Sequence, residues 1–277
     1  MKSKNKREYI LWFMCCIICT VVFAVPLLYS FANSLRSVYE GSVMGLPKVL
    51  HWENYKYAVT LIPFFRYLGS SCIIVAITVF FGVTVDFVYG YAFARLKAKG
   101  KQALFMVLLA QMMIPGCAIS IPQYIAFSNF GIKDTYWIWV LTGMAGSAFT
   151  IFQYKQYIEG ITKEIEEAAF VDGCGFFRII TQIYVPICRN IIVIGMFSHL
   201  TAAWGDYMTP FMYLTEQKYP LSIALFNQAY LLPNDPTANV EPIKLAAGFL
   251  FALVPVTAFF LCQKQLVSGV TAGAVKG

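Results

Sequence analysis

The sequence has 277 residues, of which 59% are hydrophobic, 17% aromatic and only 13% charged. Soluble domains carry about 25% charged residues, so the composition excludes an ordinary soluble protein. The net charge of +7 does not indicate a nucleic-acid partner, because the basic residues flank apolar runs instead of gathering on a polar face. Several runs reach the ~20 residues that a helix needs to cross a bilayer. The composition therefore predicts an all-α membrane protein.

In chain order, the apolar runs predict six transmembrane helices. The first run follows a basic segment, residues 1–9, but exceeds the roughly 7–15 residues of a signal-peptide core, so we expect it to be retained. The third run is interrupted at Pro115-Gly116 and at Pro122, and broken helices are tolerated where the freed backbone groups meet protein or water. The expected helices cover about Ile10–Phe31, Gly69–Ala94, Ala103–Phe127, Thr135–Tyr154, Asn190–Tyr213 and Lys244–Cys262.

These helices divide the chain into four parts. They are a basic segment with the first transmembrane helix (1–32), an extracytoplasmic loop suited to short interfacial helices (33–66), a core of membrane helices (67–264) and a cytoplasmic tail (265–277). Cytoplasmic segments of membrane proteins carry an excess of lysine and arginine. In this layout the segments placed inside hold 14 such residues and those placed outside hold 7. We therefore expect both termini in the cytoplasm.

The cytoplasmic loop 157–188 departs from the apolar pattern of its surroundings. Thr162 is a candidate N-cap for a short helix whose first turn is acidic, with Glu164, Glu166 and Glu167, and the helix dipole favours anions there. The helix is expected to end near Asp172-Gly173, because glycine commonly takes the left-handed position at a helix end.

A second short helix is expected from Gly175 to Tyr184, stopping before Pro186. One alternative is that the whole loop is amphipathic and lies on the lipid surface. A lipid-surface helix carries lysine and arginine on its polar face, whereas this segment is acidic. The composition therefore favours a docking site for another protein in the cytoplasm.

The spacing within this loop resembles the signature of binding-protein-dependent ABC importer permeases. It reads Glu167-Ala168-Ala169, three residues, Gly173, nine residues, Ile183, one residue and Val185-Pro186, with valine where the family has leucine. Three further stretches resemble the maltose-permease-G-like branch of sugar importers, namely Tyr91–Leu96 with Gly100-Lys101, Gly131–Thr135 and the tail Gly269–Gly277. The chain departs from that branch at Ile161-Thr162, where Ile-Pro is usual, and at Trp204-Gly205-Asp206, where Trp-Asn is usual.

The resemblance implies a type I ABC importer permease fold with a cytoplasmic coupling-helix loop, in a bacterial-type plasma membrane. It also implies four kinds of partner: a second homologous permease, a dimeric cytoplasmic ATPase, an extracytoplasmic solute-binding protein and a sugar, besides membrane lipid. The residues implied in coupling to the ATPase are Glu167, Ala168, Ala169, Asp172, Gly173, Ile183 and Pro186. The sequence has no GxxxxGK[ST] phosphate loop, so we expect no enzyme and no bound cofactor, with ATP and Mg²⁺ on the ATPase.

Isolated polar and aromatic residues give weaker predictions. Asp86, an acid within an apolar run, is a functional candidate by default, but the favoured alternative is a carboxylate turned into the bundle and satisfied by a neighbouring helix. Asp206 could face the translocation path or lie at the membrane interface, and His199 reads as a satisfied core histidine. The candidates for the pore or substrate path are Asp86, Gln111, Trp204 and Asp206. The candidates for contact with the binding protein are Asn227, Gln228 and Tyr230, whose loop could also be merely solvated.

Two other classes of membrane protein would require features that differ from those of this sequence. An ion-gradient-driven secondary transporter would show paired intramembrane charges and inverted repeats, and a membrane-embedded enzyme would need clustered histidine, aspartate or cysteine. The chain has two histidines, eight cysteines outside any metal-binding spacing, and no evident repeat. Neither class explains the spacing from Glu167 to Pro186. An ABC permease for a solute other than a sugar remains open.

Overall fold

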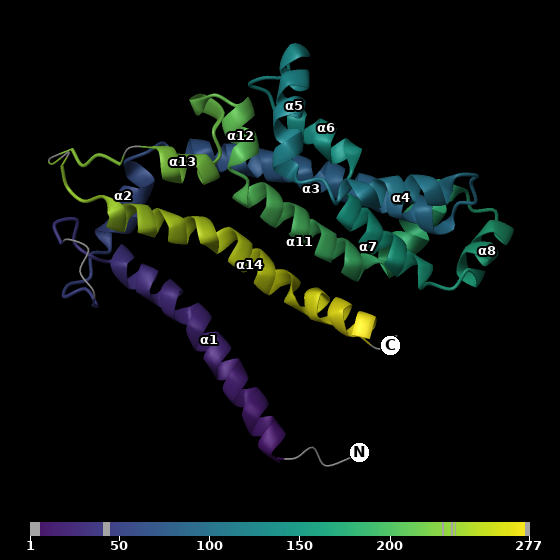
Figure 1. Ribbon diagram of the computed structural model, residues 1–277, viewed down its shortest axis with the longest axis horizontal. Helices are drawn as coiled ribbons and strands as arrows, with labels where there is room; N and C mark the ends of the chain where they lie inside the picture. Colours follow the sequence, from purple (N-terminus) through teal and green to yellow (C-terminus); the bar gives the residue numbers. More distant parts are fainter. Residues whose placement is uncertain (1–5, 41–44, 229, 234, 236, 275–277) are drawn as a thin grey trace. The chain divides into compact units, whose positions relative to one another are not determined.

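A computed structural model of the chain describes residues 6–40, 45–228, 230–233, 235 and 237–274, with side chains between residues 8 and 266 (Figure 1). The described part is helical and contains no strand. Its α-helices are α1 (Lys6–Ser34), α2 (Glu53–Thr60), α3 (Phe64–Arg95), α4 (Lys101–Gln111), α5 (Gly116–Asn129), α6 (Trp137–Ala145), α7 (Ala148–Glu159), α8 (Glu164–Val171), α9 (Phe176–Ile179), α10 (Val185–Ile187), α11 (Arg189–Gly205), α12 (Met208–Tyr213), α13 (Leu221–Asn227) and α14 (Glu241–Ala274). A π-helix, η1 (Ile180–Tyr184), and a 3₁₀-helix, η2 (Glu216–Lys218), complete the set.

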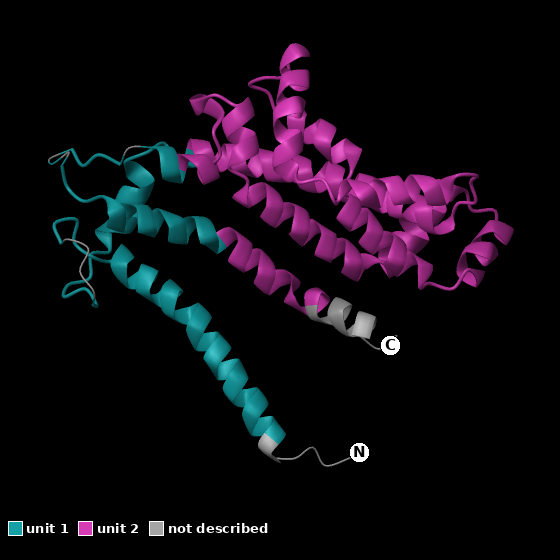
Figure 2. Ribbon diagram, in the orientation of Figure 1, with its two compact units in different colours: residues 1–65, 225–253 teal, residues 66–224, 254–277 magenta. Residues whose placement is uncertain are grey.

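The chain forms two compact units (Figure 2). The terminal unit contains residues 1–65 and 225–253, and the central unit contains residues 66–224 and 254–277. The terminal unit holds α1, α2 and the first part of α14. The central unit holds most of α3, all of α4 to α12 and the rest of α14. The candidate coupling loop therefore lies wholly within the central unit.

Three of the predicted spans are long, apolar helices, namely the first, second and sixth. Glu8–Ser34, Phe64–Arg95 and Glu241–Leu266 are each long and apolar enough to cross a membrane. Two bent pairs also qualify when each is counted as one span: α4 with α5, bent by 100°, and Phe176–Ile187 with α11, bent by 85°. The described residues thus offer three spans, or up to five.

The breaks between helices agree only in part with those predicted from the sequence. The predicted break at Pro115-Gly116 is confirmed, because α4 ends at Gln111 and α5 begins at Gly116. The predicted interruption at Pro122 is wrong, since this proline lies inside α5. The sequence predicted one helix over Thr135–Tyr154. The structure has two helices there, α6 and α7, so this prediction is wrong.

The unexpected break lies at Gly146-Ser147, between α6 and α7. Gly146 has a φ of +82°, a left-handed conformation that glycine adopts without steric penalty. The Ser147 side chain accepts a hydrogen bond from the backbone N–H of Thr150 and so caps α7. The predicted fifth helix is broken too, since α11 ends at Gly205 and α12 begins at Met208, with the Asp206 carboxylate accepting the N–H of Thr209 at 3.1 Å.

Glycines allow the helices of the central unit to cross closely. A Cβ placed on Gly195 of α11 would overlap the hydroxyl of Tyr154 on α7, and one placed on Gly90 of α3 would lie 2.6 Å from the Cβ of Tyr154. Tyr154 is fully buried and packs edge-on against Phe87. Small residues at such crossings are typical of membrane helix packing, and here they bring α3, α7 and α11 together.

A second cluster of contacts in the central unit lies between the loops 130–136 and 214–220. The Asp134 carboxylate accepts the backbone N–H and the hydroxyl of Thr215 at 3.0 and 2.9 Å, and Lys218 Nζ lies 2.9 Å from its second oxygen. We call Asp134, Thr215 and Lys218 the loop clasp. It joins two loops that are 81 residues apart in the sequence.

Candidate functional site

The first half of the loop 157–188 is the short helix α8, which begins one residue later than an N-cap at Thr162 would allow. The N-cap position is Lys163, and no side chain caps the helix, so the predicted role of Thr162 is wrong. The predicted end is confirmed. Gly173 has a φ of +79°, and its N–H bonds to Phe170 O at 3.0 Å while the N–H of Cys174 bonds to Ala169 O at 2.9 Å. This pair of bonds is the Schellman arrangement that satisfies the last carbonyls of a helix.

The second half is one continuous helical segment, Phe176–Ile187, built from α9, η1 and α10. The prediction that it stops before Pro186 is wrong. Pro186 lies inside this segment, in its last three residues, which directly follow the π-helical turn η1. The segment then turns by 85° into α11 beside Cys188, which is fully buried. The loop 157–188 and the helix α11 are therefore directly continuous.

A buried carboxylate fixes α8 to the helices around it. Glu166 is only 9% exposed, and its two oxygens accept hydrogen bonds at 2.8 Å from the hydroxyls of Tyr91 and Tyr184. Arg95 Nε lies 3.4 Å from Glu166 Oε2. We call Tyr91, Arg95, Glu166 and Tyr184 the Glu166 anchor. It joins the end of α3, the helix α8 and the segment η1.

Arg95 extends the anchor to the end of α7. Its Nη2 donates to the carbonyl oxygens of Ile158 and Ile161, at 2.9 and 2.6 Å, and its guanidinium carbon lies 5.6 Å from the centre of the Tyr184 ring. The contact from Nε to Glu166 is an ion pair without a well-aligned hydrogen bond. Because a buried charge is stable only when it is paired and hydrogen-bonded, this arrangement holds the turn between α7 and α8 in one position.

The residues predicted to couple to an ATPase divide between two faces. Ala169 is 5% exposed and belongs to the buried cluster around Phe87 and Tyr154, and Ile183 is half-buried. The others, Glu167, Ala168, Asp172, Gly173 and Pro186, are exposed. The helix α8 thus packs back on the central unit through Glu166 and Ala169, and it presents its other side outwards (Figure 1).

The outward side combines acidic and large apolar groups. Val171 is 88% exposed and Phe177 is 81% exposed, and the rings of Phe170 and Phe176 meet edge to face at 5.2 Å. Grouped apolar side chains of this size on a surface mark a contact with protein or membrane. We call Glu167, Ala168, Val171, Gly173 and Phe177 the coupling face.

The intramembrane acid Asp86 is fully buried and satisfied by two other helices. Its Oδ1 accepts the N–H of Ser147 at 2.7 Å, and its Oδ2 lies 2.9 Å from His199 Nε2. This corresponds to the alternative of a carboxylate satisfied by neighbouring helices, and to the interpretation of His199 as a satisfied core histidine. The sequence did not indicate that these two residues are partners.

The other candidates for the substrate path lie apart from Asp86 along the chain. Gln111 is exposed and is the last residue of α4, and Asp206 is half-buried between α11 and α12. Trp204 is 4% exposed and lines an apolar groove of about 540 Å³ with residues of α3, α11 and α14, including Cys72, Phe80 and Val254. The groove is therefore lined mainly by apolar and aromatic side chains.

The three candidates for binding-protein contact differ in exposure. Asn227 is exposed and Gln228 half-buried, whereas Tyr230 is only 1% exposed. Tyr230 can therefore support the shape of this loop more readily than it can touch a partner. Among the described residues, no group of three or more histidine, cysteine, aspartate or glutamate side chains could hold a metal ion.

Sequence reasoning missed the Glu166 anchor as a unit. Tyr91 and Arg95 were noticed only within a family-like motif, and Glu166 only as one acid among several. A signal was present, since Glu166 is the one acid of α8 that falls on the same face as Ala169. The partner Tyr91 is 75 residues away, and no local pattern encodes a pairing over that distance.

Comparison with known proteins gives consistent results. The model of the family described as "Binding-protein-dependent transport system inner membrane component" matches residues 87–271. Protein LplC of Bacillus subtilis is 28% identical, over 91% of this chain and 89% of LplC. The maltodextrin transport system permease protein MdxG of the same organism is 25% identical (93% and 92% covered), and the maltose/maltodextrin permease protein MalG of Yersinia pestis is 28% identical (100% and 97%).

A solved structure has the same fold. It is a chain from the crystal structure of a bacterial ABC transporter involved in the import of the acidic polysaccharide alginate. The two chains superpose with a TM-score of 0.79, covering 95% of this chain and 98% of that one, at 21% sequence identity.

Proposed function

Because the chain belongs to the binding-protein-dependent transport system inner membrane components, we propose that it is a permease subunit of an ATP-driven importer that takes up a carbohydrate. The observation that supports this most is the family match over residues 87–271, which includes the coupling loop. The relatives named as maltose and maltodextrin permeases support the class of substrate. As a membrane component of such a system the chain is not itself an enzyme, and ATP and Mg²⁺ bind to a separate ATPase.

The coupling face is the surface through which the ATPase would act. Its exposed apolar groups, Val171 and Phe177, would be covered by the ATPase, and Glu167 would lie at the edge of that contact. The Glu166 anchor would then carry any displacement of α8 to α3 and α7, because a buried, hydrogen-bonded cluster resists deformation. The continuous segment from α9 to α11 would carry the same displacement into the membrane.

The proposed topology has six spans with both termini in the cytoplasm. In it, α6 and α7 together form the fourth span, broken at Gly146-Ser147, and the two bent pairs form the third and fifth. The second permease, the binding protein and the sugar complete the assembly. Trp204 and Asp206 remain candidates for the substrate path, and Asn227 and Gln228 remain candidates for contact with the binding protein.

The test uses two variants of the coupling face, Gly173→Asp and Glu167→Lys. A Cβ on Gly173 meets nothing within 4 Å, and aspartate tolerates the left-handed conformation better than most residues, so this variant should fold. We expect both variants to insert in the membrane, to co-purify with less ATPase and to lose transport in proteoliposomes. ATP hydrolysis stimulated by the binding protein should fall with them.

Glu159→Lys is a matched control, since Glu159 is an exposed acid at the end of α7, lies outside the coupling face and pairs with Lys155 at 2.8 Å. Such surface pairs contribute little to stability, and the charge reversal is the same as at Glu167. If the ATPase stayed bound to Gly173→Asp and stimulated hydrolysis were unchanged, the proposed coupling role would be refuted.

A further inference from the structure

Tyr154 of α7 lies between two helices that approach it through glycine. Its side chain is fully buried. On one side it meets Gly90 of α3, and on the other side it meets Gly195 of α11. We call Gly90, Tyr154 and Gly195 the Tyr154 crossing. All three residues belong to the central unit, so the crossing lies within one compact part of the chain.

The two contacts of Tyr154 differ in kind. Towards α3, a Cβ placed on Gly90 would lie 2.6 Å from the Cβ of Tyr154 and 3.2 Å from the backbone nitrogen of Lys155. The backbones of α3 and α7 are therefore in direct contact. Towards α11, the group that meets Gly195 is the far end of the Tyr154 side chain, because a Cβ on Gly195 would overlap the hydroxyl oxygen.

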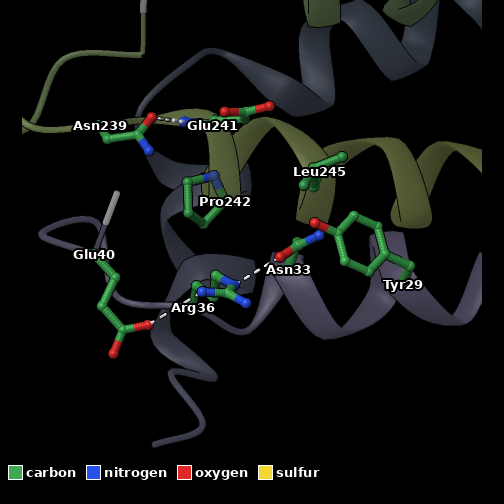
Figure 3. Close-up of a pocket in the computed structure, with 8 residues that line it drawn as sticks. All are labelled: Tyr29, Asn33, Arg36, Glu40, Asn239, Glu241, Pro242 and Leu245. Carbon is green, nitrogen blue, oxygen red and sulfur yellow. Dashed lines mark hydrogen bonds and ion pairs between the residues drawn. The ribbon is translucent and has the colours of Figure 1, made fainter. Parts of the chain in front are cut away.

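The hydroxyl of Tyr154 has no hydrogen-bond partner among the described residues. A buried donor without a partner costs free energy, because it has given up its hydrogen bonds to water and gained none in return. Two other buried polar groups show the usual arrangement. Arg36 of the terminal unit, 6% exposed, donates from Nε to Asn33 Oδ1 at 2.7 Å (Figure 3), and the Tyr184 hydroxyl donates to Glu166 at 2.8 Å. The contact of Tyr154 with α11 therefore destabilises the conformation that contains it.

One turn further along α11, hydrogen bonds hold the same three helices together. Asp86 of α3 accepts the N–H of Ser147 on α7 and contacts the ring of His199 on α11. His199 follows Gly195 by four residues, about 6 Å along the helix. Both contacts end on α3, so α11 is held firmly at His199 and only by packing at Gly195. Such an arrangement allows α11 to turn about His199.

We propose that the Tyr154 crossing is a conformational joint, at which α11 separates from α7 while the contact of Asp86 with His199 acts as the pivot. The hydroxyl destabilises the closed crossing, and separation admits water or a polar group to which it can bind. The closed and open conformations are thereby closer in free energy, as a protein that switches between two states requires. This inference rests on the proposed function in one respect, namely that the importer uses the separation during transport.

Tyr154→Phe removes the hydroxyl and keeps the ring, which packs edge-on against Phe87 at 5.4 Å. The variant should stabilise the closed crossing and raise the melting temperature of the purified chain by about 3 °C. Tyr184→Phe is the matched control, because Tyr184 is equally buried in the same cluster but its hydroxyl is bonded to Glu166. This control should lower the melting temperature.

Cys188 reports the separation directly. It is fully buried in the same cluster as Tyr154, so a thiol reagent reaches it only when the cluster opens. In a chain whose other cysteines are replaced, Tyr154→Phe should slow the labelling of Cys188 about tenfold, in line with the cost of a buried unsatisfied group. Gly195→Ala should speed the labelling, because the added methyl group overlaps the Tyr154 hydroxyl and forces the helices apart.

Transport by the assembled importer in proteoliposomes should slow several-fold in Tyr154→Phe, with the ATPase still bound. The joint is overturned if Tyr154→Phe lowers the melting temperature, leaves the labelling of Cys188 unchanged or faster, or transports at the wild-type rate. It is also overturned if Gly195→Ala is labelled at the wild-type rate. Melting and labelling use the chain alone, so a wild-type importer that took up no carbohydrate would refute the proposed function while these two measurements still decided whether the crossing opens.

Discussion

Among individual residues, Glu166 is a charged group in an almost fully buried position. Its side chain is 12% exposed and that of Arg95 is 3% exposed, yet both oxygens of the carboxylate are hydrogen-bonded. Replacing one member of such a buried pair leaves the other charge without compensation, which is far more costly than losing a surface pair. The position therefore has a large predicted effect on stability.

We expect Glu166→Gln to lower the free energy of unfolding by about 3 kcal/mol. The amide can accept only through one oxygen, and its NH₂ group would face a tyrosine hydroxyl or Arg95. Glu167→Gln changes the same chemical group on the exposed face of α8 and should stay within about 0.5 kcal/mol of the wild type. Chemical unfolding in detergent measures both. Equal effects of the two variants would contradict a buried anchor.

The loop clasp predicts a dependence on pH. The backbone hydrogen bond from Thr215, followed by the contact with Lys218, holds the pKa of Asp134 below its ordinary value of 3.8. A lowered pKa in the folded state means that the carboxylate stabilises the fold fully above the unfolded pKa. This contribution is lost as the pH falls through the folded pKa.

Asp134→Asn should therefore lower the melting temperature at neutral pH, because the amide cannot pair with Lys218. The difference from the wild type should shrink as the pH falls below 3.8, where the unfolded carboxyl takes up its proton, and disappear below the lowered pKa of the folded state. Thermal unfolding across this range provides the measurement. A difference that did not change with pH would mean that the charge of Asp134 contributes nothing.

Among the helices, the sequence predicted local features such as helix ends and breaks. It did not predict contacts between residues that are far apart in the chain. The end of α8 at Gly173 and the break at Pro115-Gly116 depend on neighbours in the chain, so composition indicated both. The break at Gly146 was missed because a single glycine within an apolar run is compatible with a helix. Asp86 and His199 are 113 residues apart, and only the crossing of α3 with α11 brings them together.

Asp86 contacts residues from α7 and α11. The free energy of its contact with His199 can be measured by mutating both residues. We expect a double-mutant cycle of Asp86→Asn and His199→Gln to give a coupling energy of about 1 kcal/mol, in the range of polar contacts between membrane helices. Unfolding of the two single variants and the double variant gives this value. A pair that does not interact, such as Asp86 with exposed Glu159, should give additive effects. Additivity at Asp86 and His199 would contradict the contact.

For the chain as a whole, the family model leaves out the N-terminal helices of the terminal unit. The family model covers residues 87–271, so α1, α2 and the loop between them lie outside it. Composition was sufficient to predict a helical membrane protein, and the loop signature was sufficient to predict the family. The number of spans did not follow as directly, because α6 and α7 are each shorter than the ~20 residues of a span.

The proposed topology is tested by two single-cysteine variants in a chain without its eight natural cysteines. Glu167→Cys lies on the coupling face, and Thr237→Cys lies in the exposed loop before α14. In intact cells, a membrane-impermeant thiol reagent should label only Thr237→Cys, and Glu167→Cys should react after permeabilisation. Labelling of both variants in intact cells would place them on one side of the membrane and rule out the topology.

The 85° turn between Phe176–Ile187 and α11 would also limit the direction of the proposed movement. When two rigid arms meet at nearly a right angle, a push along one arm has almost no component along the axis of the other. A stroke along Phe176–Ile187 would therefore displace α11 sideways and would not drive it through the bilayer like a piston. Sideways motion would keep each polar end of the helix at its own depth, so the proposed stroke would work against packing forces and not against hydration of buried charges.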